Sequence, residues 1–358
     1  MKIIYSFSAL FLCVWFLSCN KDNKIVESKP KSEVPNPIVK DTVEGIFVAL
    51  KKNSDSIRLL PFIGPSLQIK TYDGANQTTH PSILYFPEKW NGWKLWMVHT
   101  PYPFSRDFYE NPSIAVSNDG VNWTTPEGFE NPLDQCEKKI NDQKYHYSDG
   151  TLLYREDLKQ LECWYRYSKN GVLEEIWRRV SKDGKTWTKK ELMLETNAKP
   201  ENMVMSPAVI WDGERYKMWS VTANPLRVEF REAKNGKDWT EPISLETSLP
   251  KDIGPWHLEV KKTDLGYEML LDVFNIKSKD PHIKFLMSSK SQDGIIWGEF
   301  KNSMKASEQK DKWNGKMIYR SSFIKVDKLY IVYYSAMAFD FSWGLGITMG
   351  NSLDNLVY

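Results

Sequence analysis

An excess of charge of one sign is absent from this sequence. Its 358 residues include 48 Lys or Arg and 46 Asp or Glu, so the formal net charge is only +2. That balance creates no strong field for a polyanion, and we expect no nucleic-acid partner. Cysteine is also scarce. Beyond the first 20 residues only Cys136 and Cys163 occur, which excludes a disulfide framework and leaves a single bridge between them open.

Local motifs for metals and nucleotides are missing as well. The sequence contains no H-E-x-x-H, no C-x-x-C and no EF-hand loop, and neither G-x-G-x-x-G nor a P-loop occurs. We therefore predict no metal ligand and no required cofactor. The chemistry of an enzyme with this sequence is expected to be hydrolytic or lytic.

The amino-terminal segment carries the features of a secretory leader. Lys2 precedes a short apolar run, and Phe16-Leu17-Ser18-Cys19 resembles a bacterial lipobox. Residues 20–40 contain three prolines and no aromatic residue, so they cannot bury enough surface to fold. We predict a signal peptide over 1–18, followed by lipidated Cys19 and a flexible linker over 19–40. An ordinary cleaved signal peptide is the alternative.

A lipidated cysteine predicts where the protein resides. We expect a monomer in the cell envelope, tied to the membrane through its lipid anchor only, at the outer membrane or cell surface of a Gram-negative bacterium.

Internal repetition is the strongest signal. Residues 117–123, 181–187, 233–239 and 291–297 follow the pattern S-x-D-G-x-x-W, with Ala233 and Asn235 in the third copy. Asp-Gly and Asn-Gly supply the positive φ angles of a tight turn, and the Trp three residues after the Gly can fold back over it. We interpret these segments as structural turns on one face of a repeating fold.

Three short strands precede each turn, for example residues 80–86, 94–100 and 111–117. A fifth unit over 319–350 has three strands but no recognisable turn or last strand. Five units of about four strands predict an all-β, five-bladed β-propeller over residues 41–358. The open edge of the fifth unit needs a cover, and residues 45–50 are one candidate.

A five-bladed propeller with these turns, on a secreted lipoprotein, resembles the superfamily of glycoside hydrolase families 43 and 117 over roughly residues 55–358. The resemblance implies hydrolysis of O-glycosyl bonds in an extracellular poly- or oligosaccharide, and some relatives hold a structural Ca²⁺ in the channel. In family 43, three acids lie near the starts of the first three inner strands. The matching positions here are His80, Asp149 and Ser206, so only Asp149 keeps the expected type. Family 117 adds a histidine to the acid chemistry.

Strand order places the candidate site residues without reference to the family. If each first strand starts at the upper mouth of the channel, the second ends there and the third starts there, whereas the S-x-D-G-x-x-W turns lie on the lower face. The upper mouth should then collect groups for proton transfer and for sugar binding. The candidate catalytic residues are Asp149, Glu110, His257 and Glu259, and the candidate substrate-binding residues are His80, Tyr102, Arg166, Arg227, Trp256 and Arg320.

Two other functions fit the same residues. A polysaccharide lyase would use a His or Tyr base with an Arg that neutralises a uronate, and His257, Tyr147 and Arg320 are suitable types. A non-catalytic glycan-binding lipoprotein is the other alternative, because two of the three family acids are replaced.

The lipobox-like sequence generates the first prediction. Replacement of the thiol in Cys19→Ala should abolish incorporation of a fatty-acid analogue and release the protein from the membrane fraction. Metabolic labelling followed by fractionation measures both. A variant that still takes up label and stays with the membrane would contradict the anchor.

Overall fold

The computed structural model describes residues 66–136, 145–169, 173–280 and 283–357. The proposed signal peptide, Cys19, the linker and the candidate edge segment 45–50 lie outside these residues. Within them the secondary structure is almost entirely β, as the repeats predict, and none of the helices has the length and apolar character needed to span a bilayer.

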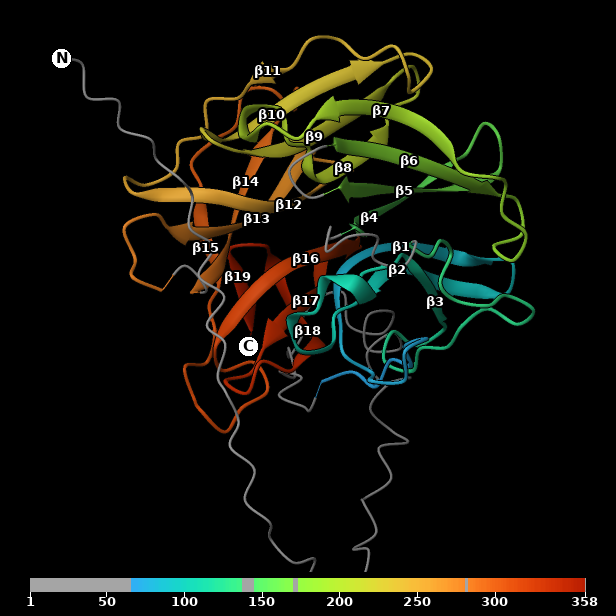
Figure 1. Ribbon diagram of the computed structural model, residues 1–358, viewed down its shortest axis with the longest axis horizontal. Coiled ribbons are helices and arrows are strands. Elements are labelled where there is room, and N and C mark those ends of the chain that lie inside the picture. Colours follow the sequence, from blue (N-terminus) through green and yellow to red (C-terminus); the bar gives the residue numbers. More distant parts are fainter. Residues whose placement is uncertain (1–65, 137–144, 170–172, 281–282, 358) are drawn as a thin grey trace, which may run out of the picture. The chain divides into compact units, whose positions relative to one another are not determined.

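Five antiparallel sheets form the blades of a β-propeller, which confirms the predicted fold (Figure 1). Blade 1 contains β1 (Thr78–Trp90), β2 (Trp93–Pro101) and β3 (Ser113–Ser117), and blade 2 contains β4 (Tyr145–Arg155), β5 (Gln160–Lys169), β6 (Leu173–Ser181) and β7 (Glu191–Asn197). Blade 3 contains β8 (Met205–Trp211), β9 (Tyr216–Ala223), β10 (Leu226–Ala233) and β11 (Ile243–Ser244), and blade 4 contains β12 (Ile253–Thr263), β13 (Gly266–Asn275), β14 (Lys284–Ser291) and β15 (Lys301–Met304). Blade 5 contains β16 (Met317–Val326), β17 (Leu329–Met337), β18 (Trp343–Ser352) and β19 (Asn355–Val357). Three short 3₁₀ turns complete the elements: η1 (Pro103–Ser105), η2 (Asp107–Tyr109) and η3 (Pro200–Asn202).

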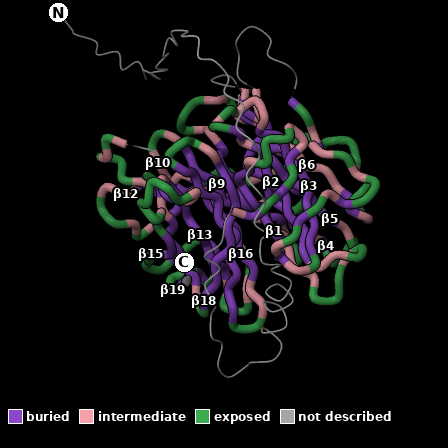
Figure 2. The backbone as a smooth tube through the Cα atoms, turned by 90° about the horizontal axis from the view of Figure 1, so that it is seen from below, coloured by how far each residue is buried: buried purple, intermediate pink, exposed green. Residues whose placement is uncertain are grey.

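The first strand of each blade lies at the axis. Going round the channel, β1 contacts β4, β4 contacts β8, β8 contacts β12, β12 contacts β16, and β16 returns to β1. Buried residues run along the strands, and exposed ones gather in the connecting turns (Figure 2).

The fifth blade corrects the sequence analysis, which predicted that its last strand is missing. The strand is β19, which pairs with the end of β18 through Met349–Val357 and Gly350–Leu356. It was missed because its turn, residues 351–354, lacks the Asp-Gly-x-x-Trp pattern. The first blade is the one with three strands, since its fourth position is reduced to a single bridge between Val116 and Thr124.

A segment before β1 covers the start of β18. The Leu67 amide donates to the Leu345 carbonyl at 2.7 Å. The Leu67 and Ile69 side chains pack in a core cluster drawn from blades 1 and 5. This contact joins the two ends of the described chain where the propeller closes.

The repeated turns are structural, as predicted. In the second turn, Asp183 Oδ1 accepts the amides of Lys185 and Thr186 at 2.8 and 2.7 Å, and the Gly184 amide donates to Ser181 Oγ. Although partial burial acts against it, donation from these amides lowers the pKa of Asp183 to about 2. The Asp183 carboxyl is therefore ionised at neutral pH and accepts the hydrogen bonds that hold the turn together.

The glycines of the second, third and fourth repeated turns also pack on an aromatic side chain of the preceding blade. A Cβ added to Gly184 would lie 1.9 Å from Trp96 Cη2, and one at Gly236 would lie 2.8 Å from the same atom of Trp164. Gly294 lies on Trp219, whose indole donates to the Gly294 carbonyl at 2.8 Å. At the closure of the ring, the hydroxyl of Tyr333 in blade 5 donates to the Gly120 carbonyl in blade 1 at 3.1 Å. The turns thus join neighbouring blades as well as strands.

This contact between blades is testable with two glycines. Gly184 (φ +74°) and Gly213 (φ +112°) both have positive φ, but a Cβ on Gly213 meets nothing within 4 Å. Gly213→Ala should lower the free energy of unfolding by about 1 kcal/mol through backbone strain alone, and Gly184→Ala by about 3 kcal/mol because Trp96 must also move. Urea denaturation measures the difference. Equal losses in the two variants would show that the Trp96 contact contributes nothing.

Candidate functional site

A bulge interrupts the pairing of each inner strand at the same level. The interruptions fall between Thr79 and Ser82, Ser148 and Thr151, Met205 and Ala208, Pro255 and His257, and Tyr319 and Ser321. In the first three blades the bulge residue has positive φ: 53° at His80, 57° at Asp149 and 51° at Ser206. Such angles are uncommon outside glycine and gather at functional sites.

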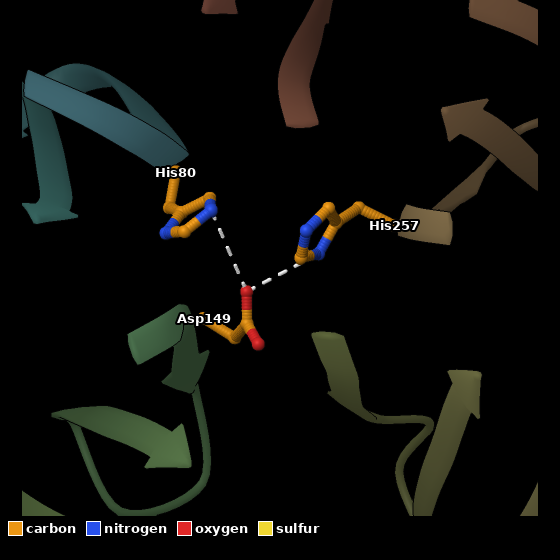
Figure 3. Close-up of side chains that lie close together, drawn as sticks. All are labelled: His80, Asp149 and His257. Atoms are coloured by element: carbon orange, nitrogen blue, oxygen red, sulfur yellow. Dashed lines mark ion pairs between the residues drawn. The ribbon is translucent and has the colours of Figure 1, made fainter. Parts of the chain in front are cut away.

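Three buried side chains from different blades converge beside the axis (Figure 3). His257 Nδ1 lies 3.3 Å from Asp149 Oδ1, and His80 Nε2 lies 3.8 Å from the same oxygen. All three side chains are at most 6% exposed. None of these three atoms makes a hydrogen bond with another described residue. A buried polar atom without a partner needs an explanation, and here three of them share one place.

The three atoms have the types and arrangement that hold a divalent cation. All lie within 4.8 Å of one another, and imidazole nitrogens with a carboxylate oxygen form a common transition-metal ligand set. Each imidazole is also held through its other nitrogen: His80 Nδ1 lies 2.9 Å from Thr100 Oγ1, and His257 Nε2 lies 2.6 Å from the Tyr319 hydroxyl. Metal-ligating histidines are oriented in this way. The residues therefore fit a metal ion.

Asp149 is the anion at the centre of this group. Burial alone would raise its pKa, but His257, His80 and Arg320 together hold the pKa well below its usual value. Arg166 Nη1 lies 3.5 Å from Oδ2, which also accepts the Ser206 amide at 3.1 Å. Asp149 is consequently ionised, and it is fixed by contacts from several blades.

Glu259 lies further along β12 from the upper mouth and is fully engaged. Its Oε1 accepts the hydroxyls of Ser82 and Ser322 at 3.0 and 2.9 Å and lies 2.8 Å from Lys261 Nζ. Its Oε2 lies 3.5 Å from Arg320 Nη2. The sequence predicts Glu259 as a catalytic residue, but its carboxylate is occupied by these partners, and it holds Arg320 in place.

Glu110 is the second carboxyl at the upper mouth. It follows η2 and is 5% exposed. Burial, with Asp107 and Asp149 nearby, raises its pKa well above the usual value despite Arg166. The pKa values of Glu110 and Asp149 are therefore shifted in opposite directions.

Tyr319 is a site residue that the sequence analysis did not identify. Its hydroxyl accepts the Trp256 indole N–H at 3.1 Å besides contacting His257, and burial raises its pKa well above the usual value. The available signal was register, since Tyr319 directly precedes Arg320 at the fifth inner-strand bulge. Tyr102 and Trp343 pack beside it, with Trp343 5.2 Å from Tyr319 between ring centroids.

The other predicted residues occupy varied positions. Arg166 pairs with Glu174 as well as Asp149, and Arg320 is buried with its Nη1 3.8 Å from Asp149 Oδ1. Arg227 instead pairs with Glu229 on blade 3. The Tyr147 hydroxyl contacts Lys190 Nζ at 2.5 Å on the side of blade 2 that packs on blade 1, so Tyr147 does not join His257 as the lyase alternative requires.

Comparison with known proteins gives one informative relative. No family model matches the sequence. Over 293 residues the chain is 27% identical to an A type blood N-acetyl-α-D-galactosamine deacetylase of Flavonifractor plautii, a match that covers 69% of this chain. The chain spans only 38% of the length of that relative.

Solved structures share the propeller fold. A crystal structure of an N-acetylgalactosamine deacetylase from F. plautii, in complex with blood group B trisaccharide, has a TM-score of 0.71 at 22% identity and covers 80% of this chain and 94% of its own. An exo-1,5-α-L-arabinanase from a bovine ruminal metagenomic library has a TM-score of 0.54 at 13% identity and covers 76% of this chain and 93% of its own. At these identities the likeness establishes the fold alone.

Proposed function

We propose that this protein is a metal-dependent hydrolase that removes the N-acetyl group from an amino sugar of an extracellular glycan. The observation that carries the proposal is the convergence of three buried ligand atoms that make no hydrogen bond with a described residue: His80 Nε2, Asp149 Oδ1 and His257 Nδ1. The name of the 27% identical relative supports the choice of an acetamido sugar. The reaction would take place at the upper mouth of the channel.

The reaction joins the oxygen of water to the acetyl carbon, breaks the amide C–N bond, and gives acetate and a free amine. A divalent cation held by His80, Asp149 and His257 would supply Lewis acidity for the amide carbonyl. Glu110, whose pKa is raised by burial, would deliver a proton to the leaving nitrogen. Water supplies the proton that restores Glu110.

Tyr319 would hold the oxygen of the substrate. With Nδ1 of His257 as a ligand, Nε2 must carry the ring hydrogen and donate it to the Tyr319 hydroxyl, which also accepts from Trp256. The proton of Tyr319 is then directed to an acceptor outside this group. Because its pKa is raised, Tyr319 keeps that proton and can donate it to the developing charge on a carbonyl oxygen.

Glycoside hydrolysis is the second candidate. Two carboxyls whose pKa values are shifted in opposite directions, Glu110 upward and Asp149 downward, are the elements of acid and base catalysis at a glycosidic bond. Glycoside hydrolysis ranks second because Asp149 faces two histidines and two arginines and Ser206 takes the place of a third acid.

The lipid anchor, the envelope location and the monomeric state belong to the proposal as well.

Release of acetate tests the proposed reaction. With Zn²⁺ or Mn²⁺, the protein should release acetate from an oligosaccharide that ends in N-acetylgalactosamine, and a chelator should abolish this reversibly. Asp149→Asn should reduce the rate at least about 100-fold by weakening the cation site. Asp212→Asn, in the β8–β9 turn, is the control and should be unaffected. Release of reducing sugar without acetate would favour the glycosidase and contradict the deacetylase.

The proton on Glu110 predicts a pH dependence. Because its pKa is raised, the protonated form persists above the usual range of a carboxyl, and the rate should fall as pH rises through that pKa. Glu110→Gln should lower kcat by about 10² to 10⁴-fold, remove this alkaline fall and leave metal affinity unchanged. Rate measurements across pH, with calorimetric titration of the metal, test both. A variant that keeps the wild-type pH profile would exclude Glu110 as the acid.

A further inference from the structure

Three exposed phenylalanines gather at the upper rim of the propeller. Phe104, Phe339 and Phe341 are 53%, 39% and 46% exposed, and within the described ranges no other Phe, Tyr or Trp is classed as exposed. Phe104 lies in the β2–β3 connection, and Phe339 and Phe341 lie in the β17–β18 connection. Both connections are on the face that carries the candidate site.

The two connections are joined into one unit. Gln77 Oε1 accepts the backbone amides of both Phe104 and Trp343, at 3.0 and 3.1 Å. The Trp343 indole donates to Ser105 Oγ at 2.9 Å. Phe104 and Phe341 are thus presented by segments of blades 1 and 5 that hold each other in place.

The backbone at these two aromatic residues is unfavourable by itself. Phe104 has φ +50° and Phe341 has φ +67°, angles that large side chains rarely adopt and that cluster where function requires them. The strained backbone presents the Phe104 ring to solvent, and it presents the Phe341 ring with Lys316 Nζ 3.8 Å from the ring centroid and the residue still 46% exposed. A ligand that covers these rings is the physical reason we infer for the arrangement.

Aromatic contacts connect the rim to the reactive centre. The ring of Trp343, next to the Phe341 segment, lies 5.5 Å from Tyr102 and 5.2 Å from Tyr319 between centroids. Tyr319 in turn contacts His257. The rim and the reactive centre are therefore connected through one aromatic cluster of Tyr102, Tyr319 and Trp343.

We propose that Phe104 and Phe341 form a subsite for a further sugar unit of the glycan, next to the amino sugar that reacts. Flat apolar rings suit the C–H face of a pyranose, with polar groups at the edge to meet hydroxyls. Asp107, Asp340 and Arg106 lie close by in sequence on the two connections, and Lys316 lies beside the Phe341 ring. The rim therefore offers polar groups of both signs to sugar hydroxyls, whereas an anionic membrane surface attracts a cluster of positive charge. This inference rests on the proposed function for the identity of the reacting sugar.

The test compares substrates of two lengths. The probes are methyl N-acetyl-α-D-galactosaminide and a trisaccharide that ends in the same sugar, with Phe104→Ala, Phe341→Ala and the double variant. The double variant should raise KM for the trisaccharide about tenfold, with kcat and the kinetics of the monosaccharide unchanged. Ile296→Ala removes a 75% exposed side chain from the β14–β15 turn on the lower face and is the control. Equal effects on both probes, or no effect on either, would overturn the subsite.

A glycan array separates failure of the subsite from failure of the proposed reaction. If wild-type protein binds oligosaccharides but releases no acetate, an approximately tenfold weaker array signal for the double variant still supports the subsite. An unchanged array signal, or no glycan binding by wild-type protein, contradicts it. Loss of vesicle binding or of self-association in the double variant, with glycan binding intact, would assign the rim to a membrane or to a second copy instead.

Discussion

A buried negative charge at the axis, that of Asp149, is the constraint on which the inner structure depends. A carboxylate removed from water is costly unless charges and donors surround it. Asp149 meets this requirement with Arg166, Arg320 and the Ser206 amide. Those arginines are held in turn by Glu174 and Glu259, and Glu259 is held by serines of β1 and β16. The charges that keep Asp149 ionised therefore also link the inner strands of several blades.

The blades supply the rigidity that this arrangement requires. Positive φ angles at His80, Asp149 and Ser206 persist only where the surrounding structure enforces them. At the bulges, the His80 amide donates to Ser335 Oγ of blade 5 and the Ser206 amide donates to Asp149 of blade 2. On the lower face, turn residues contact aromatic side chains of the preceding blade, from Trp96–Gly184 to Tyr333–Gly120. The lower face thus stabilises the ring, while the bulges on the same inner strands direct histidines and a carboxylate toward the upper mouth.

Most of the fold was predictable from sequence, because Asp-Gly turns have a local signature and recur at blade spacing. The strand β19 was not, since its turn lacks that signature. The position of Asp149, His257 and His80 near the starts of inner strands was enough to predict that they lie together at the upper mouth of the channel. Their suitability as metal ligands was not predictable, because the three residues come one each from three blades and leave no spacing motif. Whether a polar residue is already satisfied is also invisible in sequence: Glu259 and Arg227 are chemically suitable but engaged by neighbours.

Anomalous diffraction tests most directly whether His80, Asp149 and His257 hold one cation. Crystals grown with Mn²⁺ or Zn²⁺ should show a single strong anomalous peak within about 2.0–2.3 Å of His80 Nε2, Asp149 Oδ1 and His257 Nδ1, and the peak should vanish in Asp149→Asn crystals. No peak between these atoms at saturating metal, or a peak that remains in the variant, would contradict the shared cation site.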